Sequence, residues 1–277
     1  IVARKLINSL TRPFDIDGQE LSTSTSIGIA LYPANGADVD ILLKHADAAM
    51  YDAKSAGRND FRFFTPDMNN RAYARLMLEN ALRHALERNE LELDYQPQWA
   101  MPGQTLIGVE ALVRWNHPER GRISPAEFIP LAEETGLIQS IGDWVLHTAC
   151  RQQAAWLAAG LPPLTIAVNI SALQFRRADF AGHVRQVFAD TGVSPAHFEL
   201  EITESALMQP SIETEAQFAS LRSLGLGLAL DDFGTGYSSL SYLKRLPLTR
   251  LKIDRSFVRD LPGDPEDAAI ATATLSI

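Results

Sequence analysis

Residues 226–236 read LGLALDDFGTG. Three leucines alternate with small residues, and the run ends in two adjacent aspartates, Asp231 and Asp232. Because successive side chains of a strand point to opposite faces, the alternation predicts a strand with one apolar, buried face. Gly234 and Gly236 then predict a tight turn directly after it. A strand built for burial therefore ends in paired negative charge, and the rest of the chain must explain that charge.

The composition is that of a globular, acidic protein. The chain has 277 residues, enough for one large domain or two smaller ones, and 46% of them are hydrophobic. The net charge of −9 argues against a protein that coats a nucleic-acid polymer. Cys150 is the only cysteine, so we expect no intrachain disulfide and a reducing, cytoplasmic location. We find no apolar run of membrane-spanning length and no signal-peptide pattern.

The chain divides near residue 66. Before that point the sequence predicts a helical start, a strand over 22–33 and a helix over 40–57, with Gly57 at its C-terminal cap. Residues 67–89 predict a connecting amphipathic helix. Its apolar stripe comprises Leu76, Leu78, Leu82, Ala85 and Leu86. Because the chain opens in the middle of a helical pattern, we expect it to be a piece of a longer protein.

From residue 90 onward, strands alternate with helices. The candidate strands are 91–98, 106–114, 164–171, 198–204, 225–232 and 249–255. Strands that alternate with helices predict parallel pairing and an α/β class, either a TIM-like (β/α) barrel or an open parallel sheet.

Each candidate strand carries one apolar and one polar face. The polar faces hold Asp94, Gln96 and Gln98; Glu110, Leu112 and Arg114; Asn169 and Ser171; Glu199, Glu201 and Thr203; Asp231; and Arg250, Lys252 and Asp254. A sheet with one solvated side would explain this pattern, but parallel sheets are normally covered on both faces. A barrel explains it better, because the polar faces meet in the lumen and the strand ends form the active site.

Several carboxylates gathered in one place would repel each other and lose solvation. A hard divalent cation removes that cost, and carboxylate and amide oxygens suit Mg²⁺ or Mn²⁺. Adjacent aspartates suit two cations, as in sites that cleave phosphodiesters by in-line displacement. Taken singly, each signal has a plainer reading: the aspartate pair as a turn or helix cap, Glu110 as an ion-pair partner of Arg114, and Lys252 as a solvated lysine.

Five motifs together resemble the EAL family of cyclic di-GMP phosphodiesterases. They are EALVRWNHP (110–118), AVNIS (167–171), ELEITES (199–205), DDFGTGYSSL (231–240) and LKIDRSFV (251–258). The resemblance covers about residues 76–277. It implies a TIM-like barrel that linearises cyclic di-GMP to pGpG with Mg²⁺ or Mn²⁺.

The resemblance also implies roles for individual residues. The implied metal ligands are Glu110, Asn169, Glu201, Asp231 and Asp232, with Asp231 bridging two ions. The implied catalytic residues are Lys252, Glu110, Asp231 and Asp232. Among them, Lys252 would assist the attacking water. Gln96, Leu112, Arg114 and Asp254 would contact the dinucleotide. Glu204 would brace the loop 234–240, which the family uses for metal binding and dimerisation, so a homodimer through the barrel is expected.

Residues 1–66 resemble the C-terminal part of a GGDEF diguanylate cyclase domain, an α+β unit. SIGIALYP and ADAAMYDAKSAGRN carry this likeness. Lys54 and Arg58 match phosphate-binding positions of that family, although basic residues also favour helix C-termini. The GGDEF signature itself is absent, so we expect no cyclase activity from this segment.

At the other end, the family's last two barrel strands and their glutamate and glutamine motifs are absent. From this we expect little or no phosphodiesterase activity from residues 1–277 alone. The predicted organisation is thus 1–66 GGDEF-like, 67–89 connecting helix and 90–277 EAL domain. The alternatives to a phosphodiesterase are a non-hydrolytic cyclic di-GMP receptor and a regulatory dimerisation module. A zinc or iron phosphodiesterase is not supported, because none of the six histidines stands next to an aspartate in the sequence as a His-Asp pair.

Overall fold

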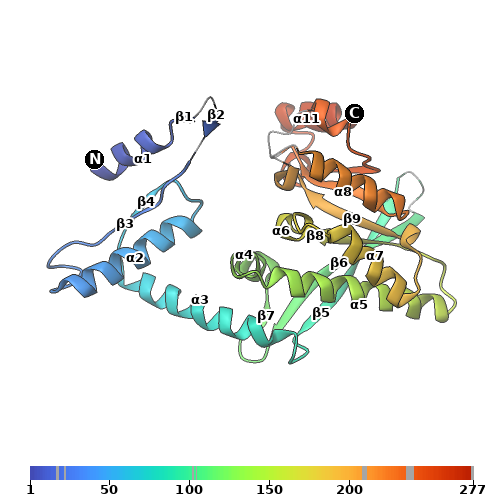
Figure 1. Ribbon diagram of the computed structural model, residues 1–277, viewed down its shortest axis with the longest axis horizontal. Helices are drawn as coiled ribbons and strands as arrows, with labels where there is room; N and C mark the ends of the chain where they lie inside the picture. The colour runs from blue at the N-terminus through green and yellow to red at the C-terminus, as the bar shows by residue number, and fades with distance from the viewer. Residues whose placement is uncertain are drawn as a thin grey trace. The chain divides into compact units, whose positions relative to one another are not determined.

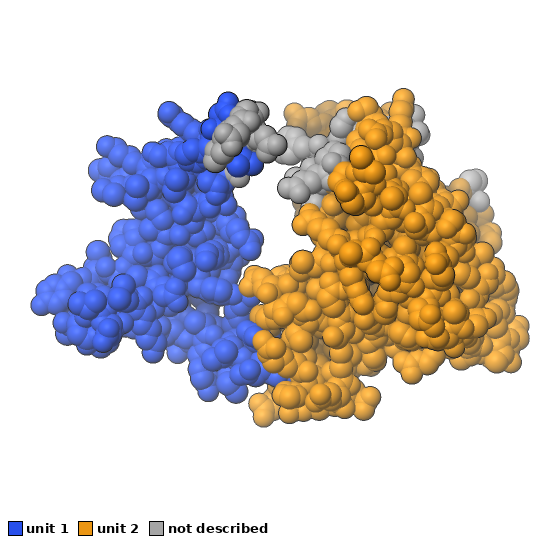
Figure 2. Space-filling model, viewed as in Figure 1, with its two compact units in different colours: residues 1–81 blue, residues 82–277 orange. Residues whose placement is uncertain are grey.

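The computed structural model describes residues 1–16, 19–21, 23–101, 103, 105–207, 211–234 and 240–275 (Figure 1). Two compact units divide the chain, Ile1–Ala81 and Leu82–Ile277 (Figure 2). Since helix α3 runs across residue 81, it belongs to both units. Each unit is described by itself below.

In its described residues, the first unit contains short strands and three helices. The elements are α1 (Val2–Leu10), β1 (Phe14–Ile16), β2 (Gln19–Leu21), β3 (Ile27–Ile29), α2 (Val39–Ser55), β4 (Phe61–Phe63) and α3 (Pro66–Ala85). Strands β1 and β2 pair antiparallel, whereas β3 and β4 pair parallel. Helix α2 lies close against β3, since a Cβ added to Gly28 would stand 1.8 Å from the carbonyl oxygen of Ala46. Ala49, Phe64 and Met68 form a small buried cluster.

Two expectations for this unit need correction. Within the described part of 22–33, the strand is Ile27–Ile29, and residues 23–26 before it stay outside the pairing. The stripe expected on α3 holds for Leu78, Leu82 and Ala85, which are buried, but Leu76 is 53% exposed. Leu76 precedes Leu78 by two residues, and residues two apart do not share a helix face. The expected helix over 40–57 is confirmed as α2, and Gly57 follows its cap with φ of 116°.

The second unit is an α/β structure around a single curved sheet. The strands are β5 (Leu91–Ala100), β6 (Thr105–His117), β7 (Gly121–Ile123), β8 (Thr165–Ile170), β9 (Phe198–Thr203), β10 (Gly227–Phe233) and β11 (Arg250–Ile253). The helices are α4 (Pro125–Thr135), α5 (Ile138–Ala158), α6 (Ala172–Phe175), α7 (Phe180–Thr191), α8 (Ile212–Ser223), α9 (Leu240–Leu243), α10 (Ser256–Arg259) and α11 (Pro265–Leu275). Two 3₁₀ turns, η1 (Pro195–His197) and η2 (Glu204–Leu207), flank β9.

The strand order is β11-β10-β9-β8-β6-β5, and β7 pairs with the far end of β6. Strands β6, β8, β9, β10 and β11 are parallel, as expected. Strand β5, however, is antiparallel to β6, and the expectation of parallel pairing was wrong for it. A parallel connection needs a dozen or more residues, and only residues 101–104 separate these two strands.

The sheet curves until its two end strands face each other. Arg250 Nη1 on β11 donates to Gln98 Oε1 on β5 at 3.2 Å, although the described parts of these strands form no ladder. The apolar face of the sheet, with Leu200, Leu228 and Leu230 fully buried, is covered by helices, among them α5, α7 and α8 (Figure 1). The polar faces consequently line the inside of a TIM-like barrel. Within the described ranges, no helix combines the length and apolarity needed to cross a membrane.

Candidate active site

Four strands bring charged side chains together around Lys252 of β11. Its Nζ lies 2.5 Å from Glu201 Oε2 on β9, 3.0 Å from Asp231 Oδ2 on β10 and 3.4 Å from Glu110 Oε2 on β6. Asn169 on β8 joins the group by donating through Nδ2 to Glu110 Oε1 at 2.7 Å. The register explains the convergence, because Asn169 pairs with Glu201 on the neighbouring strand, and each residue points into the lumen. We call these five residues the lysine cluster.

The charged side chains of the lysine cluster are buried or half-buried and unequal in sign, whereas Asn169 is exposed. The side chain of Glu201 is fully buried, and those of Glu110 and Asp231 are 18% and 19% exposed. Burial raises the pKa of Glu201 to about 7, against the opposing influence of Lys252. Burial alone would lower the pKa of Lys252, but its hydrogen bond to Glu201 and the surrounding carboxylates raise it above its ordinary value. Lys252 is therefore an ammonium ion among three acidic groups.

The two adjacent aspartates point to different neighbours. Asp231 faces Lys252, whereas Asp232 is exposed and has a left-handed backbone with φ of 54°, uncommon for a residue with a side chain. The backbone N–H of Asp232 donates to Asp231 Oδ1 at 2.9 Å. Burial, with the nearby charges of Asp231 and Asp254, raises the pKa of Asp232. The strained turn at the strand end thus presents two carboxylates on two sides.

Glu204 and Asp254 bind residues outside the lysine cluster. Glu204 is buried, and its Oε2 accepts a hydrogen bond from the backbone N–H of Gly234 at 3.1 Å. Of the loop 234–240, residues 235–239, including Gly236, lie outside the described residues. Asp254 accepts from the hydroxyl and the backbone N–H of Ser256, and these bonds lower its pKa.

The donor set of the lysine cluster suits a hard divalent cation. Glu110, Asn169, Glu201 and Asp231 offer oxygens only, the preference of Mg²⁺ and Mn²⁺. Glu201 Oε1 is buried and has no hydrogen-bond partner, a costly state that a cation would relieve. Among the described residues, no three His, Cys, Asp or Glu side chains already surround a common ion position. The three carboxylates instead converge on Lys252 Nζ. The fit to a divalent cation therefore rests on the type of ligand atom and not on the present geometry.

Two pockets adjoin these residues. The first, of about 380 Å³, is lined by Asp94, Tyr95, Gln96, Leu112 and Arg114. It thus contains three of the four residues predicted to contact substrate.

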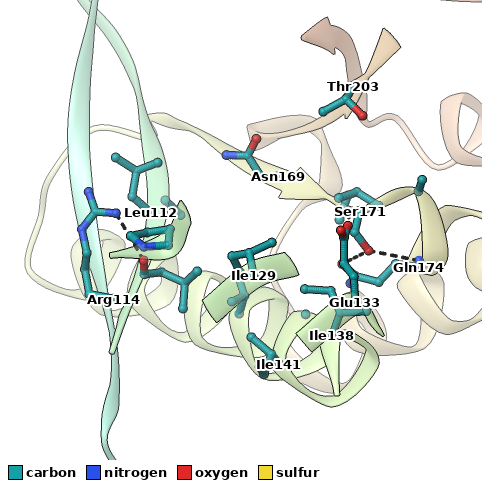
Figure 3. A pocket seen from close by; sticks show the side chains of 17 residues that line it. Leu112, Arg114, Ile129, Glu133, Ile138, Ile141, Asn169, Ser171, Gln174 and Thr203 are labelled. Atoms are coloured by element: carbon teal, nitrogen blue, oxygen red, sulfur yellow. Dashed lines mark hydrogen bonds between the residues drawn. The ribbon is translucent and has the colours of Figure 1, made fainter. Parts of the chain in front are cut away.

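The second pocket, of about 400 Å³, is mostly apolar and lies between β6, α4 and α5 (Figure 3). Leu112, Arg114 and Asn169 line it from the sheet, while Glu133 and Gln174 line it from the helices. Burial raises the pKa of Glu133. The pocket therefore connects the predicted substrate residues with Asn169 of the lysine cluster.

The sequence analysis missed three residues at or near this site. Arg122 on β7 and Glu133 on α4 had no signal in the strand pattern, because β7 is too short for alternation and Glu133 lies on a helix. Arg250, noted only for its face, also contacts the buried Glu199 at 3.2 Å. Lys54 and Arg58 lie in the first unit and are exposed, so their phosphate-binding role stays a prediction.

A curved, mostly parallel sheet with charged side chains in its lumen is the architecture of TIM-barrel-like enzymes, whose active sites lie at the strand ends. The chain belongs to the EAL domain family, whose family model matches residues 79–277. A second model, diguanylate cyclase, GGDEF domain, matches residues 1–60. The boundaries that we predicted at 66 and 90 remain predictions.

Curated relatives match the whole length of the chain. It is 48% identical over 276 residues to the bifunctional diguanylate cyclase/cyclic di-GMP phosphodiesterase MucR of Pseudomonas aeruginosa, and covers 40% of that protein. It is 41% identical to the cyclic di-GMP phosphodiesterase PdeR of Escherichia coli, covering 42% of it. The chain thus spans about two fifths of the length of these relatives. It is 50% identical to a solved structure of the PaMucR phosphodiesterase in complex with c-di-GMP, with a TM-score of 0.69, covering 71% of this chain and 80% of that one.

Proposed function

We propose that the second unit hydrolyses cyclic di-GMP to linear pGpG. The observation that carries this proposal is the lysine cluster, in which three carboxylates and one amide from four EAL motifs converge at one end of a barrel. Relatives support the substrate: PaMucR is a phosphodiesterase solved with c-di-GMP, and PdeR is named a cyclic di-GMP phosphodiesterase.

EAL domains are metal-dependent phosphodiesterases. We propose two ions, Mg²⁺ or Mn²⁺, held by Glu110, Asn169, Glu201, Asp231 and Asp232. When bound, such ions offset the carboxylate charge and stabilise negative charge that develops on the phosphate. The buried, unpartnered Oε1 of Glu201 supports this assignment, because it is an acceptor without a donor.

The protonation state of Lys252 decides its role. Its hydrogen bond to Glu201 and the nearby carboxylates raise the pKa of Lys252, which favours the ammonium form before any ion binds. It acts as a hydrogen-bond donor that orients water or stabilises charge on the phosphate. Its short contact with Glu201 and its contact with Asp231 hold the ammonium group at the position where these side chains meet.

The two pockets support the substrate assignment. Arg114 presents a planar guanidinium, which matches a phosphate or a guanine edge by paired hydrogen bonds. Gln96 offers an amide to a base edge, and Leu112 offers apolar contact from a position shared by both pockets. Asp254, two residues after Lys252, is the fourth residue assigned to substrate.

Separate measurements of binding and turnover test the proposal. A version of the chain that carries all barrel strands of an EAL domain should bind cyclic di-GMP by calorimetry and release pGpG when Mg²⁺ or Mn²⁺ is added. Tight binding without turnover in either metal would favour the receptor alternative. Absence of both binding and turnover would refute the assignment of substrate. Homodimerisation through the barrel is proposed on family resemblance alone, and sizing with light scattering tests it.

A further inference from the structure

Asp94 on β5 lies between two arginines. Arg114 Nε donates to Asp94 Oδ2 at 2.9 Å, and Arg122 Nη2 donates to the same oxygen at 2.6 Å. Arg122 Nη2 also donates to Glu92 Oε1 at 3.3 Å. We call these four residues the arginine cluster. Two arginines and two carboxylates balance its charge, so it calls for no further ion.

The strand register shows that Arg114 does not take its nearest carboxylate. Across the β5–β6 ladder, Arg114 stands opposite Glu92, whereas Asp94 stands opposite Leu112. Arg114 nevertheless pairs with Asp94, one step diagonally toward the pocket that holds Gln96 and Leu112. Arg122 reaches over β6 from its own position opposite Asn116 and takes Glu92. Glu92 therefore forms its ion pair with Arg122 and not with Arg114, the residue opposite it on β6.

Two contacts fix the plane of the Arg114 guanidinium. Nε is bound to Asp94, and Nη1 donates to the carbonyl oxygen of Val113 at 3.2 Å. A planar group held at two of its nitrogens has little freedom left to rotate. Nη2 makes no hydrogen bond to any residue in the described ranges, and Arg114 lines both pockets. The free edge of the guanidinium is thus available to an incoming acceptor.

We propose that Asp94 and Arg122 are positioning residues, which hold Arg114 toward the substrate pocket and keep it away from Glu92. This inference rests on the proposed function, in which Arg114 contacts the dinucleotide. A purely stabilising role is a poor explanation for the arginine cluster. Asp94 is 43% exposed and Arg122 is 50% exposed, and exposed ion pairs contribute little to folding stability.

The test compares Asp94→Asn and Arg122→Ala with Arg120→Ala. Arg120 is a matched control, because it lies beside the same hairpin and forms an exposed ion pair with Glu127, outside the arginine cluster. Calorimetry with cyclic di-GMP should show an affinity loss of about tenfold for Asp94→Asn, the size of one charge-assisted hydrogen bond. Arg122→Ala should cause a smaller loss. Arg120→Ala should leave affinity unchanged, and the Tm of all three variants should stay near that of the wild type.

A rescue experiment separates positioning from other roles of Arg122. Without Arg122, the charge of Glu92 is free to draw Arg114 away from the pocket. Adding Glu92→Gln to Arg122→Ala should therefore restore most of the lost affinity. In an Arg114→Ala background, Asp94→Asn should cause no further loss. If the double variant stays weak, or if Asp94→Asn still lowers affinity without Arg114, the inference is overturned.

A measurement without ligand keeps this inference distinct from the proposed function. The Nε–H resonance of Arg114, assigned in ¹⁵N spectra by its absence in Arg114→Lys, should be sharp in the wild type. It should broaden or shift in Asp94→Asn and Arg122→Ala but not in Arg120→Ala. An unchanged resonance in the first two variants overturns the positioning role. A wild type with the expected resonance that fails to bind cyclic di-GMP refutes the proposed function instead.

Discussion

The lysine cluster and the arginine cluster lie on the same sheet but differ in charge balance and in exposure to solvent. In the first, one ammonium group meets three carboxylates, and Glu201 is fully buried. In the second, two guanidinium groups meet two carboxylates, and three of the four side chains are 43–50% exposed. The charged side chains of the lysine cluster are largely buried and have an excess of negative charge, whereas those of the arginine cluster are mostly exposed and balanced in charge.

This difference indicates what each cluster is for. Buried charge must be paired, so the excess of carboxylates and the unpartnered oxygen of Glu201 support the cation site that we propose for the lysine cluster. A balanced, exposed cluster is complete by itself, and its value lies in the orientation that it gives to Arg114. Removing a charge should therefore affect chemistry in the lysine cluster and geometry in the arginine cluster.

The largest effect is expected for Asp231→Asn. Asp231 is the carboxylate to which we assign both proposed ions, and the substitution removes its charge while keeping its size. In a version that carries all barrel strands of an EAL domain, hydrolysis of cyclic di-GMP should fall by several orders of magnitude. The control is Asp190→Asn on α7, an exposed aspartate whose hydrogen bond from Gln186 the amide can still accept. Unchanged turnover of Asp231→Asn at saturating Mg²⁺ would contradict the assignment.

The next effect is stabilisation by divalent ions. A ligand that binds only the folded state stabilises it by about 2.7 kcal/mol at a concentration of 100 times its Kd. Mg²⁺ or Mn²⁺ should therefore raise the Tm of the second unit by several degrees. All four tryptophans, Trp99, Trp115, Trp144 and Trp156, lie in that unit, so their fluorescence reports on it alone.

The comparison between clusters supplies the controls for this experiment. Glu201→Gln, in the lysine cluster, should reduce the metal-dependent rise in Tm. Glu92→Gln, in the arginine cluster, should leave it unchanged. An equal rise in all three proteins would mean that the ions bind elsewhere.

The sequence predicted the lysine cluster better than the arginine cluster, for a physical reason. Period-two alternation on long strands identifies lumen-facing residues, and β6, β8, β9, β10 and β11 lie close to the predicted ranges. Their parallel register then brings Glu110, Glu201 and Lys252 together. The arginine cluster depends instead on the antiparallel β5–β6 pairing and on β7, a strand of three residues. Neither feature is encoded in a periodic pattern.

Local exceptions in the sequence were equally hard to predict. Simple alternation would put Asp232 on the apolar face of β10 with Leu228 and Leu230, but its backbone is left-handed and its side chain is exposed at the strand end. On α3, a count of apolar residues placed Leu76 in the stripe, although its angular position does not match that of Leu78. A periodic pattern describes a whole strand or helix. The side-chain direction of Asp232 depends instead on its own φ angle, and that of Leu76 on its own angular position around the helix.

A smaller effect is expected from Arg114→Lys, which tests the geometry of the arginine cluster. Lysine keeps the charge but cannot present a planar pair of donors or bind Asp94 at a second nitrogen. Affinity for cyclic di-GMP should fall by about tenfold, the size of one charge-assisted hydrogen bond. The metal-dependent rise in Tm should persist. Calorimetry that finds equal dinucleotide affinity in both proteins would show that charge alone suffices at this position.

The smallest effect concerns the stability of Glu133→Gln. Glu133 is a carboxylate that belongs to neither the lysine cluster nor the arginine cluster. No ion pair or side-chain hydrogen bond to another described residue engages it, and burial raises its pKa in the folded state. Its ionisation therefore costs stability, and this cost begins as pH rises above the ordinary pKa of a glutamate, about 4.3. Glu133→Gln removes the cost. The variant should be more stable than the wild type at pH 7.5, by less than about 1 kcal/mol since the group is only partly buried.

Urea unfolding followed by tryptophan fluorescence from pH 4 to pH 8 measures this difference. The advantage of Glu133→Gln should shrink as pH falls and be small near pH 4, where wild-type Glu133 is mostly protonated in both states. Glu119→Gln, at an exposed position beside the hairpin, should show no advantage at any pH. If Glu133→Gln is instead less stable than the wild type at pH 7.5, ionised Glu133 must gain a favourable interaction in the folded state. Its charge would then be compensated, as the charges of the arginine cluster are.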